Sequence, residues 1–324
     1  MAGVKGDNNS AVFFQNYWPA YFLNYYMRCR AFGKRIPILA GFKITHKCNL
    51  NCRHCPFWKK PEQVTLSFKR VVDILQSLRE CGIRIIIFEG GEPFLWKDGI
   101  YTIHDVVQEA KKFFFSVGLV TNGTFPLDVP SDVLWVSIDG LHDTNRQIRG
   151  NSFKQILRHI ETSRHANLLV NITINSLNHK EIPALVKYFT GKVRGFTIQF
   201  HYPYDGEHAL CLTAEDRVAV LQELLDLKQE GYPVLDSYDC LKALQANSWR
   251  CEDWMIANAE PDGQINMGCY VKNRAEVHCS LCGFAAHAEI SQAFQLKLAP
   301  FLAGIKIFRY RNLGRINTAF GSAL

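Results

Sequence analysis

Three cysteines lie close together at Cys48, Cys52 and Cys55. Thiolates at the spacing C-x3-C-x2-C can bind three corners of a [4Fe–4S] cube from one short loop. The fourth iron then lacks a protein ligand, and an open metal position is where a cofactor or substrate binds. Zinc is the alternative, but His54, the nearest fourth ligand, is squeezed between two of the cysteines and badly placed. The spacing therefore predicts a cluster with one open iron.

A second group of cysteines lies near the other end of the chain: Cys251, Cys269, Cys279 and Cys282. A turn at Pro261-Asp262-Gly263 and an apolar, strand-like segment at 264–267 separate the first two. Four thiolates could ligate a whole second cube, or Cys251 could lie outside the set and leave an open iron. The same four cysteines also suit tetrahedral zinc, and a use without metal is a third interpretation. We favour an iron–sulfur site.

The other four of the eleven cysteines, Cys29, Cys81, Cys211 and Cys240, are scattered along the chain. We interpret them as small buried hydrophobic residues. An odd cysteine count is not typical of a disulfide framework, and the first ten residues lack the apolar core of a signal peptide. We therefore expect a reducing, cytoplasmic setting.

The composition is that of an ordinary globular protein of 324 residues, with 48% hydrophobic and 21% charged residues. It excludes wholesale disorder. The net charge of +7 is too mild to indicate nucleic-acid binding, and no nucleic-acid partner is expected. No run of about 18 apolar residues is present, so no membrane-spanning helix is expected.

The middle of the chain alternates between strand-like and helix-like patterns. The expected strands are 41–45, 84–88, 116–121, 133–138, 168–174 and 195–201. The expected helices are one following Ser67, then 105–112, 153–165, 182–189 and 214–230, with Thr213 and Asp216 as a capping box for the last. Six strand–helix units predict an α/β fold, a parallel sheet curved into a partial (β/α)6 TIM-like barrel, because eight units are needed to close the full barrel.

We divide the chain into three parts: an N-terminal aromatic and basic segment at 1–37, the barrel core at 38–235, and an irregular cysteine-rich extension at 236–324. Aromatic residues recur at helical spacing in the first part, followed by basic ones; they are Phe14, Trp18, Tyr21, Phe22 and Tyr25, then Arg28, Arg30, Lys34 and Arg35. Such a stripe suits an interfacial helix facing lipid. The competing interpretation packs it on the core.

The cysteine loop and several later segments together resemble the radical S-adenosylmethionine (radical SAM) superfamily. Gly90-Gly91-Glu92-Pro93 is similar to the family's GGEP segment, and Thr121-Asn122-Gly123 and Ser137-Ile138-Asp139-Gly140 to segments that reach the ribose and methionine moieties. Residues 142–153 are similar to its HD…IRG…SF stretch. The resemblance implies SAM-binding residues Gly90, Gly91, Glu92, Pro93, Thr121, Asn122, Ser137, Asp139 and Arg149. One departure is His54, where the family often has an aromatic residue.

The resemblance extends more weakly into the C-terminal part. The turn at 261–263 followed by a strand and a cysteine looks like the start of the family's auxiliary-cluster extensions. No cysteine follows Cys282, which favours the short, one-cluster Twitch type over the longer SPASM type. Residues 278–284 also resemble a stretch of hopanoid-lipid radical SAM proteins.

The resemblance implies an enzyme whose [4Fe–4S] cluster cleaves SAM reductively. The products are methionine and a 5′-deoxyadenosyl radical, which abstracts hydrogen from a substrate. No acid–base catalytic residue is assigned. The aromatic segment and the basic run 306–311 favour a lipid or isoprenoid substrate, taken by a protein peripheral to the inner face of the membrane. The alternatives are a peptide-modifying enzyme and a non-catalytic iron–sulfur or zinc protein. A reductant such as ferredoxin or flavodoxin is the implied partner.

Overall fold

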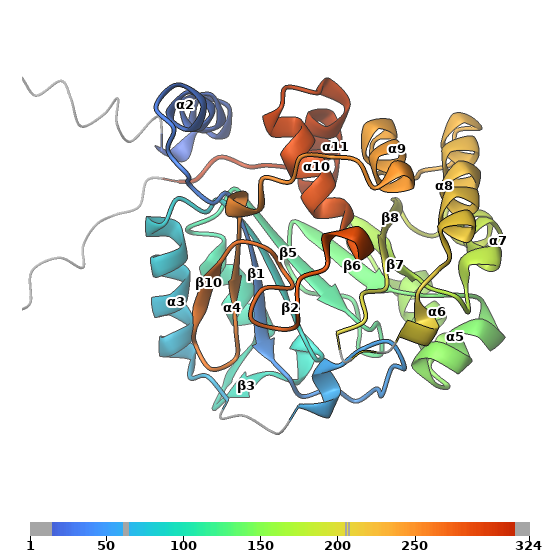
Figure 1. Ribbon diagram of the computed structural model, residues 1–324. Helices are drawn as coiled ribbons and strands as arrows, with labels where there is room; N and C mark the ends of the chain where they lie inside the picture. Colours follow the sequence, from blue (N-terminus) through green and yellow to red (C-terminus); the bar gives the residue numbers. More distant parts are fainter. Residues whose placement is uncertain (1–14, 61–64, 205, 207, 315–324) are drawn as a thin grey trace, which may run out of the picture.

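The centre of the molecule is a curved, mostly parallel sheet (Figure 1). The computed structural model describes residues 15–60, 65–204, 206 and 208–314. The strand order is β10-β9-β1-β2-β5-β6-β7-β8. The strands are β1 Leu39–Thr45, β2 Ile85–Gly90, β5 Ser116–Thr121, β6 Val133–Ser137, β7 Leu168–Ile174, β8 Gly195–Phe200, β9 Ile256–Ala259 and β10 Ile265–Met267; a small hairpin pairs β3 Lys97–Asp98 with β4 Tyr101–Thr102.

The six expected strands are confirmed as β1, β2, β5, β6, β7 and β8, each parallel to its neighbours. The sequence did not predict that the sheet continues past β1. There β9 pairs in parallel with β1, with Leu39 opposite Ile256, and β10 pairs with β9 in the antiparallel direction. The segment beyond residue 236 therefore completes the same sheet. The observed fold is therefore the partial barrel that the sequence predicted.

Helices cover the outside of the sheet and one of its ends. They are α2 Trp18–Ala31, α3 Phe68–Glu80, α4 Ile103–Ala110, α5 His142–Arg149, α6 Phe153–Thr162, α7 Ile182–Phe189, α8 Ala214–Gln229, α9 Tyr238–Ala246, α10 Ala285–Phe294 and α11 Leu298–Phe308. Ser67 caps α3 and Thr213 caps α8, each accepting a backbone N–H three residues on. Helix α5 falls in a stretch that the sequence did not mark as helical.

The concave side of the sheet encloses a cavity of about 850 Å3. Its wall changes along the strands. Near their starts the lining side chains are apolar, as at Leu39, Ile85 and Ile256, whereas near their ends they are polar, as at Lys43 and Glu89. Because side chains alternate across a strand, residues two apart share the inner face. The barrel interior thus has one apolar end and one polar end.

Helix α2 lies across the apolar end, and its aromatic side chains face the protein. Tyr21 and Tyr25 are each 6% exposed, and their hydroxyls donate hydrogen bonds to the carbonyl oxygens of Gly82 and Ile36, both at 2.7 Å. Trp18 and Phe22 pack on Tyr310, with ring centroids 5.4 and 5.1 Å apart. Of the two interpretations of the stripe, these contacts agree with the one that packs it on the core and not with the one that turns these four residues toward lipid, because the rings bury apolar area against the protein.

Phe14, the fifth member of that aromatic stripe, lies outside the described residues. Within the described part of the chain, no helix is both long enough and apolar enough to cross a bilayer.

Candidate metal and cofactor site

The loop after β1 carries Cys48, Cys52 and Cys55 to the polar end of the cavity, which all three line. Backbone contacts hold the loop: the amide of Cys55 donates to the carbonyl of Cys52 at 3.1 Å, and that of Arg53 donates to Ile148 on α5 at 2.8 Å. Each of the three sulfurs lies within electrostatic reach of the other two. The structure therefore brings the three predicted ligands together on one fixed loop.

Donors from neighbouring elements point at two of these sulfurs. The amide of Leu50 lies 3.4 Å from Cys48 Sγ, and Asn122 Nδ2 lies 3.8 Å from the same atom. Arg149 Nη1 lies 3.9 Å from Cys52 Sγ. N–H groups and positive charge around sulfur stabilise a thiolate, which is the form that binds metal. The residues present thus fit an iron–sulfur cluster.

The glycines at the end of β2 are required by the cysteine loop itself. A side-chain carbon on Gly90 would lie 2.2 Å from the carbonyl oxygen of Thr45, and one on Gly91 would lie 2.1 Å from that of Lys47. The freed space lets Gly91 N donate to Thr45 O at 2.7 Å and Glu92 N to Lys47 O at 2.8 Å. Both glycines also line the cavity, so they serve the loop and remain open to a ligand.

Glu92 is fully buried and accepts hydrogen bonds from two segments of the chain. Its carboxylate accepts hydrogen bonds from the Thr121 hydroxyl at 2.8 Å and from the amides of Asn122 at 2.7 Å and Phe94 at 3.2 Å. Burial raises its pKa to about 7. Glu92 and the buried Pro93 do not line the cavity. They lie behind the site, where Glu92 can hold Thr121 and Asn122 in position.

Asp139 and Arg149 form a buried ion pair beside the cysteine loop. Arg149 Nε lies 2.5 Å from Asp139 Oδ2, and the other carboxylate oxygen accepts from Thr173 N at 2.8 Å. Burial alone would lower the pKa of Arg149, but Asp139 and Cys52 outweigh it and raise that pKa. Arg149 lines the cavity and Asp139 does not, so the carboxylate acts on the site through the arginine.

Of the nine residues predicted to bind SAM, six line the cavity: Gly90, Gly91, Thr121, Asn122, Ser137 and Arg149. They come from the ends of β2, β5 and β6 and from α5. Because the carboxyl ends of parallel strands meet at one edge of a sheet, these six surround the cysteine loop. Glu92, Pro93 and Asp139 stand behind them.

A charged group in the cavity escaped the sequence reasoning. Lys43 Nζ donates to Glu89 at 2.8 Å and contacts the Tyr270 hydroxyl, which in turn lies 3.2 Å from the same carboxylate. Burial, followed by the charge of Arg274, lowers the pKa of Lys43 to about 8. A signal was present: Lys43 interrupts an otherwise apolar strand, and a lysine is seldom fully buried without a partner.

The C-terminal cysteines form a separate group that does not line the cavity. The sulfurs of Cys269 and Cys282 lie within electrostatic reach of each other and of both Cys251 and Cys279. The buried His287 adds a nitrogen 3.8 Å from Cys251 Sγ. Cys251 and Cys279 are exposed. Tyr270, next to Cys269, connects this group to the cavity.

The spacing of the sulfurs bears on which metal they suit. Four thiolates around one zinc lie about 3.8 Å apart, given Zn–S bonds of about 2.3 Å. In the part of the chain that the structure describes, three or more potential ligand atoms lie within 4.8 Å of one another in one place, at Asp236, Cys240 and Glu289. Neither cysteine group is that compact.

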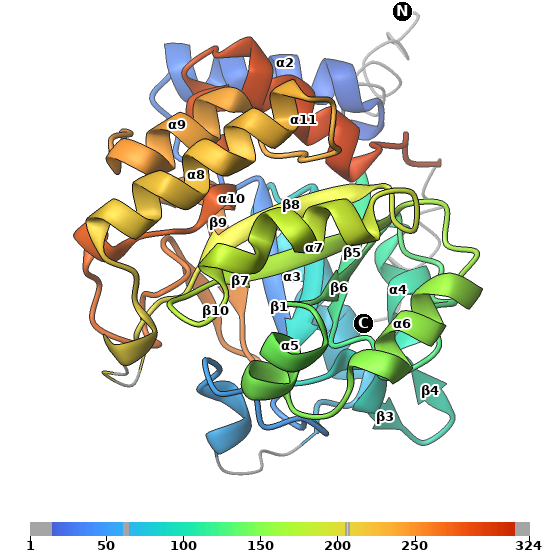
Figure 2. The same cartoon turned by 90° about the vertical axis from the view of Figure 1, so that its right-hand side faces the viewer.

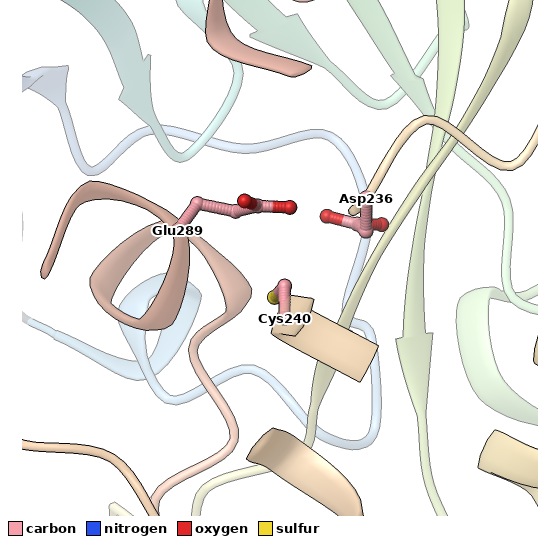
Figure 3. A group of neighbouring side chains, drawn as sticks. All are labelled: Asp236, Cys240 and Glu289. Carbon is pink, nitrogen blue, oxygen red and sulfur yellow. The ribbon is translucent and has the colours of Figure 1, made fainter. Parts of the chain in front are cut away.

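Asp236, Cys240 and Glu289 converge at the side of the cavity (Figure 3). Their polar atoms are already satisfied by the protein: Glu289 accepts from the amide and hydroxyl of Ser237, and Asp236 accepts from Ile198 N at 2.9 Å. Burial raises the pKa of Asp236 to about 7 and that of Glu289 to about 8. The three act as hydrogen-bonding groups that fix α9 and α10 to β8.

Comparison with known proteins agrees with this geometry. Residues 42–189 match the model of the Radical SAM superfamily. Fe-coproporphyrin III synthase of Methanosarcina barkeri is 26% identical over 224 residues, which are 62% of this chain and 55% of that protein. An uncharacterized protein of Archaeoglobus fulgidus is 28% identical over 161 residues, 46% of this chain and 38% of that protein. The chain spans less than two thirds of the length of these curated relatives.

Among solved structures, SuiB of Streptococcus suis bound to S-adenosylmethionine is similar, with a TM-score of 0.62 and 12% identity over 81% of this chain and 67% of that one. At this identity the likeness shows the fold alone. The part of the chain that matches the radical SAM superfamily model, residues 42–189, includes the cysteine loop and most of the barrel strands. Members of this superfamily are enzymes.

Proposed function

We propose that this protein cleaves SAM reductively and uses the resulting radical on a substrate held in the barrel. The observation that carries the proposal is the position of three clustered thiols, with sulfur-directed donors, at the polar end of an enclosed cavity. Cys48, Cys52 and Cys55 would hold a [4Fe–4S] cluster, and the chemistry supplied would be one-electron cleavage of SAM to methionine and a 5′-deoxyadenosyl radical, which would take a hydrogen atom from the substrate.

The residues of this chain bind, orient and shield. Cys48, Cys52 and Cys55 hold the cluster, and Asn122 and Arg149 direct hydrogen bonds toward its sulfurs. Gly90, Gly91, Thr121 and Ser137 surround the space for SAM, while Glu92, Pro93 and Asp139 position them. No side chain is needed as an acid or base in the radical step, because hydrogen moves as an atom.

A second, auxiliary iron–sulfur cluster at the C-terminal cysteines is part of the proposal. The gathering of four cysteines in one part of the fold, with the buried His287 beside Cys251, supports it. A Twitch-type extension of this kind, spanning 236–324, would follow the barrel core at 38–235. The route from this site to the cavity runs through Tyr270, whose hydroxyl meets Glu89 and Lys43.

The shape and polarity of the cavity support a lipid or isoprenoid substrate. Beyond the polar end, the wall is built from side chains such as Ile85, Trp135, Ile256 and Phe294. An apolar lining gains free energy by burying apolar ligand surface, at about 25 cal/mol per Å2. A polar group of the substrate would meet Lys43, Glu89 and Tyr270. The protein would then work at the inner face of a membrane, with ferredoxin or flavodoxin as electron donor.

Peptide modification is the second candidate. The structure of Streptococcus suis SuiB bound to its precursor peptide SuiA is similar to this chain, with a TM-score of 0.60 at 13% identity over 83% of this chain and 69% of that one. That likeness concerns the fold. A peptide backbone needs hydrogen-bonding partners along its length, and the apolar end of this cavity offers few, which favours the lipid.

The test is anaerobic reconstitution with iron and sulfide, then detection of 5′-deoxyadenosine after adding dithionite and SAM. We expect product from the native protein and none from the triple variant Cys48→Ala, Cys52→Ala, Cys55→Ala. Cys81→Ala, which alters an exposed cysteine away from both groups, is the matched control and should match the native protein. Equal product from the triple variant, or none from the reconstituted native protein, would overturn the proposal.

A further inference from the structure

Large apolar side chains are exposed around the end of the barrel that α2 covers. Leu23 on α2 is 66% exposed, and Leu296, just before α11, is 70% exposed. Including their neighbours, we call this set the mouth surface: Leu23, Met27, Leu296, Leu298, Phe301 and Leu302. Exposing several large apolar residues together costs free energy in water and marks a site of contact with another apolar surface.

The two segments of the mouth surface are distant in sequence but adjacent in space. Tyr26 on α2 packs on Phe294 of α10, with ring centroids 5.7 Å apart, and Leu313 N donates to Asn16 O at 2.9 Å. In Figures 1 and 2, α2 and α11 lie in one layer over the same end of the barrel. The exposed residues therefore belong to one end of the molecule.

The mouth surface is continuous with the apolar end of the cavity. Leu23, Leu296 and Phe301 line the cavity and are exposed at the same time, so the cavity opens between α2 and α11. From there the lining continues past Phe294 and Ile85 to the polar end at the cysteine loop. The β1 strand of this wall spans roughly 23 Å at about 3.3 Å per residue, enough for a long apolar chain.

Charge on α2 and the loop after it has one sign, whereas at the start of α11 the cation Lys297 is paired with Asp239 at 3.2 Å. The sequence contains no Asp or Glu from residue 8 to residue 61, nor from residue 290 to its end. The helix α2 and the loop after it instead present Arg28, Arg30, Lys34 and Arg35, all exposed. On an ideal helix, Arg30 lies on the same stripe as Leu23 and Met27. An apolar surface bordered by positive charge is complementary to an anionic bilayer, to which each basic residue adds about 1 kcal/mol.

From these observations we propose that the mouth surface docks on an anionic phospholipid bilayer and that the apolar part of the substrate enters the cavity from the membrane between α2 and α11. This rests on the proposed lipid substrate. The face of α2 that meets lipid in this proposal is therefore the one that carries Leu23 and Met27, opposite to the aromatic stripe. The polar group of the substrate then lies toward Lys43 and the cysteine loop, and the apolar chain trails toward the bilayer.

The test is flotation of the full chain with vesicles of phosphatidylcholine, with and without phosphatidylglycerol. We expect the native protein to float with the anionic vesicles. The double variant Leu23→Glu, Phe301→Glu should bind at least tenfold more weakly, since each apolar side chain withdrawn from lipid is worth about a factor of ten. Arg28→Glu with Arg30→Glu should weaken binding to anionic vesicles and remove its dependence on salt.

Two matched controls isolate the surface. Ile100→Glu changes an exposed apolar residue on the turn between β3 and β4, and Lys154→Glu reverses an exposed charge on α6, both away from α2 and α11. Both should float like the native protein, and all variants should keep the native circular dichroism spectrum. Native protein that stays at the bottom, or mouth variants that float as well as Ile100→Glu, would overturn the proposal.

Two further readouts separate the alternatives. If mouth variants sediment as a smaller species than a native protein that does not float, the surface joins two copies of the chain and the membrane proposal fails. Flotation does not require the metal site, so the triple cysteine variant should float normally. Membrane binding without SAM cleavage would then contradict the proposed function alone, and SAM cleavage without membrane binding would contradict this inference alone.

Discussion

The two cysteine groups differ in what surrounds them. The N-terminal group sits on one short loop, lines the cavity, and is supported by the buried pair of Asp139 and Arg149. The C-terminal group is gathered from a longer stretch of chain, has two exposed members, and reaches the cavity through Tyr270. Three ligands facing a cavity suit a reactive metal, and four ligands beside it suit a site that is closed or supportive. The difference supports our proposal that the first group carries the SAM chemistry.

Replacing all four C-terminal cysteines by alanine should give the largest separation between the two sites. The reconstituted native protein should hold about eight irons if both sites carry cubes, and the quadruple variant about four. Cleavage of SAM in the absence of substrate should persist, because the N-terminal loop does not contact these cysteines. Iron analysis and 5′-deoxyadenosine measurement check this. An iron content near four with one bound zinc in the native protein would favour the zinc interpretation.

The buried ion pair belongs to the first site alone, and breaking it should destabilise that region. Arg149→Met leaves Asp139 buried without its charged partner, and we expect the free energy of unfolding to fall by about 3–5 kcal/mol. The double variant Arg149→Met, Asp139→Asn should recover part of the loss, because no buried charge is left. Urea denaturation of the apo forms measures both. A single variant as stable as the native chain would show that the pair does not support the loop.

Glu289, in the C-terminal part of the chain, is a partly buried carboxyl group on which the pH dependence of stability rests. Burial raises the pKa of Glu289 to about 8. The native state therefore holds a proton that the unfolded chain has released above about pH 4.5, so stability is greatest below that pH and is lost as the pH rises toward 8. Glu289→Gln should reduce the loss of folding stability between pH 4.5 and 8 by about 3 kcal/mol. The carboxyl group of Asp236 titrates together with that of Glu289 and contributes to the same loss. Thermal unfolding from pH 4.5 to 8 measures it, and identical profiles would contradict it.

The smallest expected effect tests the contact between the C-terminal cysteine group and the cavity, which is made by Tyr270. Tyr270→Phe removes the hydroxyl that contacts Lys43 and Glu89 and should cost about 1–3 kcal/mol of stability, since it leaves a buried ammonium with one partner fewer. Tyr101→Phe, at an exposed position, is the control and should cost nothing measurable. If the proposed substrate meets this group, Tyr270→Phe should slow substrate conversion more than substrate-free SAM cleavage. Equal slowing of both would remove the hydroxyl from the substrate site.

The sequence predicted the barrel strands well because each is a continuous apolar run ended by polar residues, as expected for strands covered on both faces. It could single out the cysteine loop as a candidate metal site because cysteines that lie close in sequence need no knowledge of the fold to be grouped. It could not place β9, whose four residues, Ile256–Ala259, include an asparagine and form a strand through pairing with β1. Strand formation of this kind depends on tertiary contacts.

The direction in which side chains point is the second feature that the sequence could not predict. The stripe on α2 was correctly recognised as one face of a helix, yet the sequence alone could not decide whether that face meets lipid or protein. Phe115 and Tyr310, which cover it, come from distant parts of the chain. Likewise, Glu92 was expected to contact SAM, and its buried hydrogen bonds to Thr121 and Asn122 become visible when β2 and β5 are placed side by side.

The pairing of β9 with β1 also has a consequence for the order of biosynthesis. Leu39 lies opposite Ile256, so the strand leading into the cysteine loop gains its second neighbour after most of the chain has been synthesised. Contacts this distant in sequence form late, and domains emerging from the ribosome fold as their segments become available. We expect a nascent chain shorter than about residue 260 to leave one wall of the cavity missing. Loading of metal into a complete cavity would then have to await the emergence of β9 from the ribosome.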